Sequence, residues 1–356
     1  MENTKQHVRA LVLKYGQNPA SYLALEDDKS HFFGQQVDGV IAYGCVGNVI
    51  VVQGDPICAA EDFCALLSEF DAFCNAHGYI CVFSDTTDVF LDVYTQMGYG
   101  HIKCGEEARF DLEDYNLKGG KAARLRADIN HANKAGLTTY EYKPNAQRDE
   151  SVEKGIAVVS DKWMDGKKSG ELGFSVGGVG LDNPMDRRYF YAKNEAGDIV
   201  GFNVFIPFAG MDGYLADVTR RLPDAPGGVT EKLTYDGFMV FREEGKKWGS
   251  MGLAPLANLH EEGIKDSAAV KMLAFIYEKC NDFYGFKALH RAKERYNPSA
   301  WMPGYYVFSG KMFSPHMAYA LIKIKNPNGI KDYMLGFLKE IHTKMHIPHI
   351  FGHKHE

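Results

Sequence analysis

Long apolar runs, paired cysteines and a secretion signal are missing from this sequence. No stretch approaches the roughly 18 to 20 apolar residues that a membrane-spanning helix needs, and the polar residues 1–6 do not resemble a signal peptide. The seven cysteines are odd in number, form no C-x-x-C pair and lie mostly in apolar runs. These absences exclude a disulfide-framed secreted domain, and we expect a cytosolic protein with reduced core cysteines.

One common catalytic motif is also missing. The phosphate-binding pattern G-x-x-x-x-G-K-[ST] does not occur in the chain. The net charge of −6 argues against non-specific binding of nucleic acid. Basic residues nevertheless gather over 118–134 and again at Lys287, Arg291, Lys293 and Arg295. Each cluster either meets a polyanion locally or forms an exposed helix face.

The composition is that of a folded, aromatic-rich protein, with 45% hydrophobic residues, 20 Tyr and 22 Phe in 356 residues. This length exceeds a usual single core, so two domains of about 150 residues each are expected. Apolar periodicity supports the division because it predicts one order of elements twice: a β-meander, then helix, strand, helix and strand.

In the first half, we expect helices over 7–15, 61–76 and 88–97, and strands over 37–43, 48–53, 79–84 and 108–112. In the second half, the expected helices are 151–163, 231–247 and 268–284, and the strands are 138–142, 188–192, 199–205, 213–216, 250–253 and 305–308. This order suits an α/β (α+β) fold in which each copy is a mixed sheet flanked by helices. The predicted boundaries are 1–117, a linking helix over 118–136, a second domain over 137–325, and an amphipathic helix with a polar tail over 326–356.

One stretch between an expected strand and an expected helix concentrates chemistry. Asp217 and Arg220 come where the strand over 213–216 is expected to end, and Gly227-Gly228 stands where a long helix begins. Backbone N–H groups and the helix dipole at such a place favour negative charge. The alternative is a solvated salt bridge followed by a Pro/Gly turn.

Together with this stretch, five motifs occur in order along the second half: Asp161-Lys162-Trp163, Glu171 through Gly177, Asp217 through Glu231, Met251 through Leu256, and Lys293 through Pro298. With Tyr15 through Pro19, Gly54-Asp55-Pro56 and Trp301 through Tyr305, they cover nearly the whole chain. In these motifs the sequence resembles the soluble catalytic domain of bacterial aminoacyl-phosphatidylglycerol synthases, the phosphatidylglycerol lysyltransferase (multiple peptide resistance factor) family. The resemblance implies a tandem pair of acetyltransferase-like (GNAT) domains. Many members carry a long polytopic N-terminal region, which is not expected here.

The activity that the resemblance implies is transfer of a lysyl or alanyl group from aminoacyl-tRNA to a hydroxyl of phosphatidylglycerol or a related lipid, at the cytoplasmic face of the membrane. One ester replaces another, so neither a cofactor nor a metal is expected, and the partners are aminoacyl-tRNA and an anionic phospholipid but not DNA. The acetyl-CoA loop Gln/Arg-x-x-Gly-x-Gly/Ala is missing, which disfavours acyl-CoA as donor. The alternatives are a peptidoglycan-precursor aminoacyltransferase of the same fold and a non-catalytic lipid- or tRNA-binding module.

The resemblance also places Asp217 and Arg220 in the acid-x-x-Arg pair of the active site. Asp217 either polarises the attacking hydroxyl or holds the ammonium of the aminoacyl group, and Arg220 suits a phosphate or a developing oxyanion. The other expected substrate-binding residues are Lys293 and Arg295 for phosphate, Glu261 for the amino-acid moiety, Glu171, Phe174 and Ser175 for cavity shape, and Arg126 for tRNA or phosphate. Each of these has a plain alternative as surface charge, loop acid or strand edge.

The C-terminal tail carries histidines at 342, 346, 349, 353 and 355 and a lysine-rich amphipathic stretch over 331–345. The histidines suit a polar tail better than a metal site, because no cysteine or carboxylate set accompanies them. The amphipathic stretch either rests on an anionic membrane leaflet or packs on the core.

Overall fold

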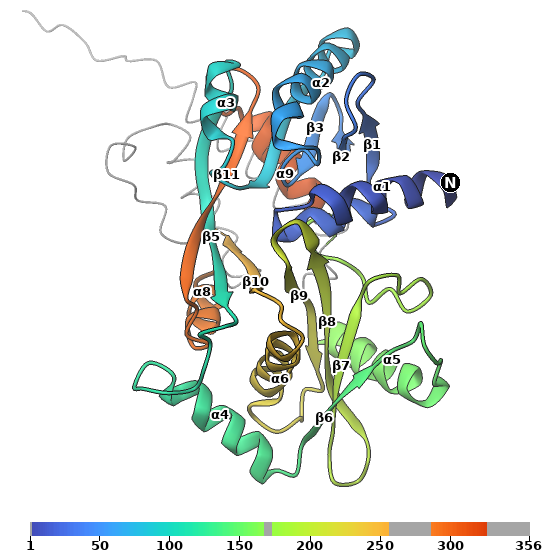
Figure 1. Cartoon of the computed structure of the whole chain (residues 1–356), viewed down its shortest axis with the longest axis vertical. Coiled ribbons are helices and arrows are strands. Elements are labelled where there is room, and N and C mark those ends of the chain that lie inside the picture. Colours follow the sequence, from blue (N-terminus) through green and yellow to red (C-terminus); the bar gives the residue numbers. More distant parts are fainter. Residues whose placement is uncertain (1, 167–172, 256–285, 326–356) are drawn as a thin grey trace, which may run out of the picture.

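A single mixed sheet of eleven strands organises the molecule. The computed structural model describes residues 2–166, 173–255 and 286–325. Across the sheet the strands lie in the order β1-β2-β3-β4-β11-β5-β10-β9-β8-β7-β6. Most of the N-terminal half, from α1 to β5, lies in the upper part of Figure 1 together with α9, and the elements from β6 to β10 lie in the lower part.

The N-terminal half contains, in chain order, α1 (Glu2–Tyr15), η1 (Pro19–Leu25), β1 (Ser30–Phe33), β2 (Val40–Val46), β3 (Val49–Gln53), η2 (Ala60–Asp62), α2 (Phe63–His77), β4 (Ile80–Thr86), α3 (Leu91–Gln96) and β5 (Gly100–Asp111). Helix α4 (Ala123–Lys134) leads to the second half.

The second half contains β6 (Thr138–Tyr142), α5 (Glu150–Asp165), β7 (Arg188–Lys193), β8 (Ile199–Phe208), η3 (Ala209–Met211), β9 (Gly213–Arg221), α6 (Val229–Glu243), β10 (Trp248–Pro255), α8 (Phe286–Glu294), β11 (Ala300–Phe308) and α9 (Pro315–Lys325). The duplicated order of meander, helix and strand is thus confirmed, and so is the mixed α/β class. The expected helix over 268–284 and the tail from 326 lie outside the described residues. Strand β1 and helices α8 and α9 were not predicted.

The two halves exchange their last strands. Strand β11 of the second half lies between β4 and β5 of the first, antiparallel to both, with Val307 opposite Phe83 and Trp301 opposite Ala108. Strand β5 in turn separates β11 from β10. These two long strands run side by side from the upper to the lower part of Figure 1. Each half therefore completes its sheet only with a strand of the other, and the division at 117 and 136 stays a prediction.

Local signals in the sequence explain where the helices begin and end. The Asp149 side chain accepts hydrogen bonds from the N–H groups of Ser151 and Val152, which caps the start of α5. Helix α2 ends at Gly78, whose φ of 68° is the left-handed conformation that glycine adopts without strain. The buried residues of α2 follow helical spacing: Phe63, Leu66, Leu67, Phe70 and Cys74.

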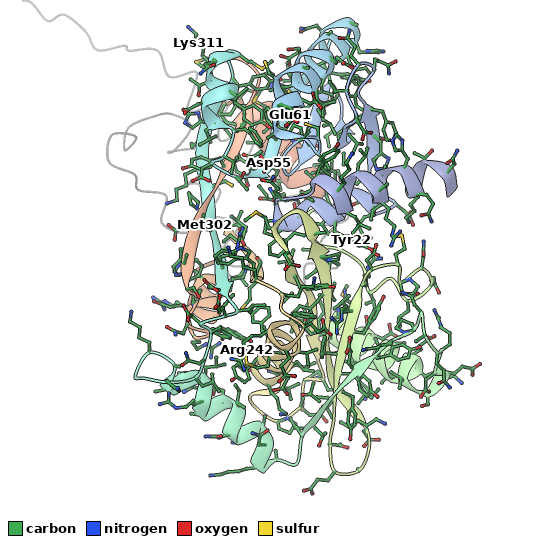
Figure 2. All side chains as sticks on the ribbon, viewed as in Figure 1. Tyr22, Asp55, Glu61, Arg242, Met302 and Lys311 are labelled. Carbon is green, nitrogen blue, oxygen red and sulfur yellow. The ribbon has the colours of Figure 1, made fainter. Side chains whose placement is uncertain are left out.

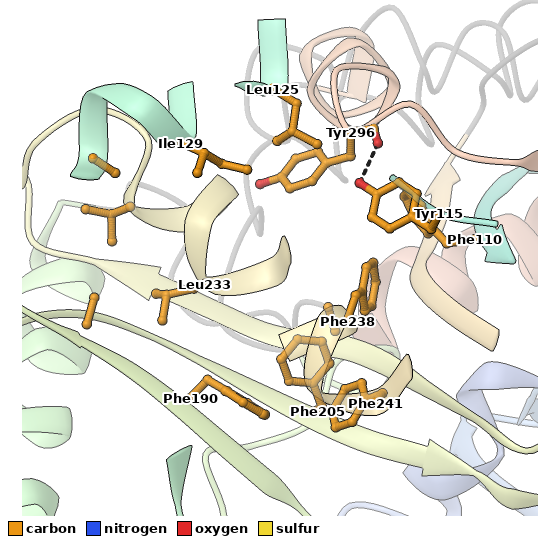
Figure 3. Packing of buried hydrophobic residues seen from close by; sticks show 14 of the residues in the cluster. Phe110, Tyr115, Leu125, Ile129, Phe190, Phe205, Leu233, Phe238, Phe241 and Tyr296 are labelled. Carbon is orange, nitrogen blue, oxygen red and sulfur yellow. Dashed lines mark hydrogen bonds between the residues drawn. The ribbon is translucent and has the colours of Figure 1, made fainter. Parts of the chain in front are cut away.

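A cluster of aromatic side chains forms the core under α6 (Figure 3). Phe205 of β8 packs against Phe238 and Phe241 of α6 at ring-centroid distances of 5.8 and 5.0 Å. Helix α4 lies against α6 at Gly228, which has a φ of 87° and where a Cβ would meet the Asp128 carbonyl oxygen at 2.0 Å. Only glycine fits there, so this residue of the Gly-Gly pair is required by packing between helices.

The N-terminal segment joins the two halves on the other side. Tyr22 of η1, labelled in Figure 2, is fully buried with Ile206, Phe208 and Leu215 of β8 and β9. Its hydroxyl donates to the Asp186 carboxylate at 3.5 Å and accepts from the Asp186 N–H at 3.1 Å. The first half thus packs directly against β8 and β9, and β9 is the strand that carries Asp217.

Candidate active site

The sequence predicted that this strand would end before Asp217. Strand β9 instead runs on to Arg221. Its pairing with β8 shifts there, because Val204 lies opposite Val218 while Phe205 lies opposite Ala216. Asp217 is the extra residue of this β-bulge. A bulge turns a side chain away from the regular alternation of a strand and is common beside active sites.

A second irregularity opens the sheet next to this bulge. Strands β9 and β10 are parallel and pair only from Trp248 to Ser250, although both strands continue beyond this point. Strand β10 then has its own register shift against β5, between Ser250 and Leu253. A cavity of about 590 Å³ lies at this opening, lined by β9, β10, η1, α5, α8 and α9 among other segments.

Asp217 lines this cavity and accepts hydrogen bonds on both carboxylate oxygens from the Gly177 N–H, at 3.2 and 3.1 Å. Burial and, to a smaller extent, the negative charge of Glu26 raise the pKa of Asp217 to about 7. The Gly177 hydrogen bond and the positive charges of Arg187 and Lys29 act in the opposite direction. The carboxyl group therefore exchanges its proton near neutral pH, as a general base or acid requires.

Arg220 also lines the cavity, and helix α5 holds its guanidinium group. Its residue is 5% exposed, Nη1 donates to the Ser160 hydroxyl, and the guanidinium lies 5.1 Å from the centre of the Trp163 ring. Cation–π contact and hydrogen bonding fix the plane of the group. The motif Asp161-Lys162-Trp163 thus has a physical role, because one face of α5 orients the arginine.

Lys293 lines the cavity, but its ammonium group binds backbone carbonyls of β10. The residue is only 7% exposed, and Nζ donates to the carbonyls of Gly252 and Leu253 at 2.9 and 2.6 Å. Burial lowers the pKa of Lys293 to about 7, although the negative charges of Glu107 and Asp85 partly oppose this. Lys293 ties α8 to the irregular part of β10. Arg295, by contrast, is exposed and lines the cavity.

The other expected site residues have different positions. Ser175 lines the cavity and donates to the Gln53 side chain at 3.0 Å. Phe174 points into the core with a φ of 64°, and Lys29 lies over its ring at 4.2 Å. Arg126 donates to the carbonyls of Leu117 and Gly119 and is not among the described residues that line the cavity. Glu171 and Glu261 lie outside the described residues.

The sequence did not predict the part of the cavity wall that helix α9 forms. Helix α9 presents Ala318, Leu321, Ile322 and Lys325 to it, at the spacing of one helix face. The Lys325 ammonium lies 3.6 Å from Asp85, to which Gln53 also donates at 3.2 Å. Asp85 has a φ of 63°, which is unusual for a non-glycine residue and marks a constrained position. The helical spacing of residues 318–325 was the signal available in the sequence.

Two negative findings apply to the described ranges 2–166, 173–255 and 286–325. No group of three or more His, Cys, Asp or Glu side chains there is arranged to hold a metal ion. None of the helices in these ranges has the length and apolar character needed to cross a membrane.

The fold and the cavity define a class of duplicated α/β proteins with solved representatives. The structure of L-PGS from Bacillus licheniformis matches with a TM-score of 0.76 and 28% identity, covering 90% of this chain and 96% of that one. The C-terminal domain of a putative lysylphosphatidylglycerol synthetase from Agrobacterium fabrum matches with a TM-score of 0.78 and 22% identity, over 93% and 99% of the two chains. FemX shares the fold alone, at a TM-score of 0.52 and 12% identity over 85% and 95% of the two chains.

Within this class, the chain belongs to the family described as "Phosphatidylglycerol lysyltransferase, C-terminal", whose profile matches residues 9–308. The phosphatidylglycerol lysyltransferase of Staphylococcus epidermidis is 30% identical over 302 residues, which are 84% of this chain and 35% of the relative. That of Bacillus subtilis is 30% identical over 303 residues, or 85% and 35%. The chain thus spans about a third of the length of these curated relatives.

Proposed function

We propose that the protein transfers an aminoacyl group from aminoacyl-tRNA to a hydroxyl of phosphatidylglycerol at the cytoplasmic face of the membrane. The proposal rests on one observation above all: Asp217, with a pKa of about 7, and the oriented Arg220 line the same cavity. The membership of a phosphatidylglycerol lysyltransferase family supports the choice of substrates.

In the proposed reaction, the ionised Asp217 accepts the proton of the lipid hydroxyl while the hydroxyl oxygen attacks the aminoacyl ester carbon. The bond to the ribose oxygen then breaks, and this oxygen takes up the proton that Asp217 accepted, so the carboxylate is ionised again as the tRNA leaves. Arg220 stabilises the negative charge that develops on the carbonyl oxygen. One ester bond forms and one breaks, so the reaction is balanced without a further reactant.

Two parts of the cavity wall suit two different substrates. The exposed Arg295 suits the phosphates of a tRNA acceptor end. The apolar face of α9 suits an acyl chain, and Lys325, one turn further along the helix, suits an anionic headgroup. An apolar stripe that ends in an ammonium group matches an anionic amphiphile.

The central test is formation of the product. The purified protein, given lysyl-tRNA or alanyl-tRNA and phosphatidylglycerol in mixed micelles, should produce a ninhydrin-positive lipid that thin-layer chromatography separates from its substrate. Treatment with ribonuclease before the reaction should prevent this product. If neither donor gives an aminoacyl lipid but a muropeptide acceptor is modified, the protein is a peptidoglycan-type transferase. If no acceptor is modified, the enzymatic proposal fails.

The proposed binding site for the acceptor lipid can be tested separately. Lys325→Ala should raise the KM for phosphatidylglycerol about tenfold, because a charge-assisted contact with a phosphate is lost. The KM for aminoacyl-tRNA should stay unchanged. Lys323→Ala is a matched control, since Lys323 has the same charge, lies on the same helix and is not among the described cavity-lining residues. Equal effects of the two substitutions on the lipid KM would place the headgroup elsewhere.

A further inference from the structure

The segment over 173–187, which connects two elements of the second half, passes between two acids. On one side, its Gly177 N–H binds both oxygens of Asp217. A Cβ on Gly177 would lie 2.2 Å from Asp217 Oδ2 and 3.0 Å from Glu26 Oε1. The two carboxylate groups therefore face each other across a glycine, and no larger residue fits between them without a shift.

Glu26 belongs to the N-terminal half and is held in a fixed place. It directly follows η1, and its N–H donates to the Leu23 carbonyl. Its carboxylate accepts from Arg187 Nη2 at 2.5 Å. The Arg187 side chain is only 4% exposed, lies over the Tyr22 ring at 5.4 Å and donates to the Asn183 carbonyl. At its C-terminal end, the connecting segment thus places the buried guanidinium group of Arg187 against the carboxylate of Glu26.

Lys29 supplies a second cation, which comes from the N-terminal half. Its side chain is fully buried, forms an ion pair with Asp28 and lies over the Phe174 ring. The Asp28 carboxylate also accepts from the Phe174 N–H at 2.9 Å. The charged groups that act on Asp217 from neighbouring elements are therefore Glu26, Lys29 and Arg187, while Arg220 on its own strand is bound to Ser160 and Trp163 of α5.

We propose that Glu26, Arg187 and Lys29 are positioning residues that set the charge state of Asp217 through the glycine contact at Gly177. None of the three is among the described residues that line the cavity, so they act on the reaction only through Asp217. The negative charge of Glu26 favours the protonated form of Asp217, and the two cations favour the ionised form. Two of these residues, Glu26 and Lys29, come from the N-terminal half, so that half helps to set the charge state of the acid on β9. The catalytic part of this inference rests on the proposed function.

Two measurements test it, and one does not need activity. The first is the pH profile of kcat/KM for transfer. The second is the difference in thermal stability between each protein and its Asp217→Asn derivative from pH 4 to 9. Because the folded-state pKa of Asp217 is raised, the stabilising effect of the Asn substitution should grow as pH rises and level off above that pKa.

Each measurement shows a transition at the pKa of Asp217: one in kcat/KM, the other in the stability difference. Glu26→Gln should move both transitions about one pH unit toward acid, since a nearby negative charge is lost while Arg187 keeps an acceptor. Transfer at pH 6 should then rise about fivefold relative to its own alkaline plateau. Lys29→Met should move both transitions toward alkaline pH. If Lys29→Met fails to fold, Glu26→Gln alone still decides, because it is nearly isosteric.

Glu141→Gln is a matched control. Glu141 pairs with Arg188, the residue next to Arg187, and its side chain is 16% exposed against 18% for Glu26. It is not among the groups that act on Asp217, so its substitution should move neither transition. Unchanged transitions in Glu26→Gln, or equal changes in Glu141→Gln, would overturn the inference. If the wild type forms no aminoacyl lipid, the proposed function fails while the stability measurement still tests the contact.

Discussion

Asp217→Asn should lower the rate of aminoacyl transfer at least about a hundredfold and leave the fold intact. The substitution is nearly isosteric and keeps an oxygen that accepts from the Gly177 N–H. An amide cannot accept a proton near neutral pH, so the substitution removes the general base. General base catalysis contributes roughly 10²- to 10⁴-fold to a reaction rate. The measurement is single-turnover formation of aminoacyl lipid at pH 8, with circular dichroism as the check on folding.

The same substitution should stabilise the protein at alkaline pH. Burial raises the pKa of Asp217 to about 7, whereas an unfolded aspartate has a pKa of about 3.9. The raised folded-state pKa favours the native protein below about pH 4, and this advantage is lost as pH rises to about 7. Removing the charge should then recover stability on the order of 4 kcal/mol at pH 8. If the gain in stability of Asp217→Asn over the wild type is no larger at pH 8 than at pH 5, the pKa of Asp217 is not raised in the folded protein.

Arg220→Lys should also lower kcat/KM by about a hundredfold, although the positive charge is kept. A lysine ammonium group cannot form two parallel hydrogen bonds to an oxyanion or phosphate and cannot stack its plane on Trp163. The loss should appear in kcat/KM with both substrates, because the arginine acts at the reacting centre.

Arg221→Lys is the control for this substitution. Arg221 is the next residue along β9, is exposed, and donates to the Leu222 carbonyl. Its substitution should change neither activity nor stability by more than about 0.5 kcal/mol. Near wild-type turnover in Arg220→Lys would show that the arginine has only a structural part in holding α5.

The sequence predicted most elements because they depend on local signals. The apolar spacing of α2, in which Phe63 and Phe70 lie two turns apart on the same face, identifies a helix without tertiary information. The stretch that holds Asp217 and Arg220 was singled out from its expected place between a strand and a helix, but only the resemblance to the family assigned the pair to the active site. Both residues line the cavity, and their roles in catalysis stay a prediction.

The remaining features depend on contacts between residues far apart in the chain. The bulge at Asp217 arises from its register with β8, and no local pattern indicates it. Lys293 looks like any surface lysine in the sequence, but the irregular backbone at Gly252 and Leu253 takes up its ammonium group. The position of β11 between β4 and β5 is likewise a choice among strand pairings that alternation alone cannot decide.

The exchanged strands also determine what happens while the chain is being made. Strand β5 ends at Asp111, and its neighbour β11 begins only at Ala300. At a synthesis rate of about 5 to 20 residues per second, the ribosome needs on the order of 10 to 40 seconds to cover this interval. During that time β4 and β5 have no strand to insert between them, and open strand edges pair readily with other chains. A nascent chain that stops before Ala300 therefore lacks the strand that closes its first half, and we expect such fragments to aggregate or be degraded.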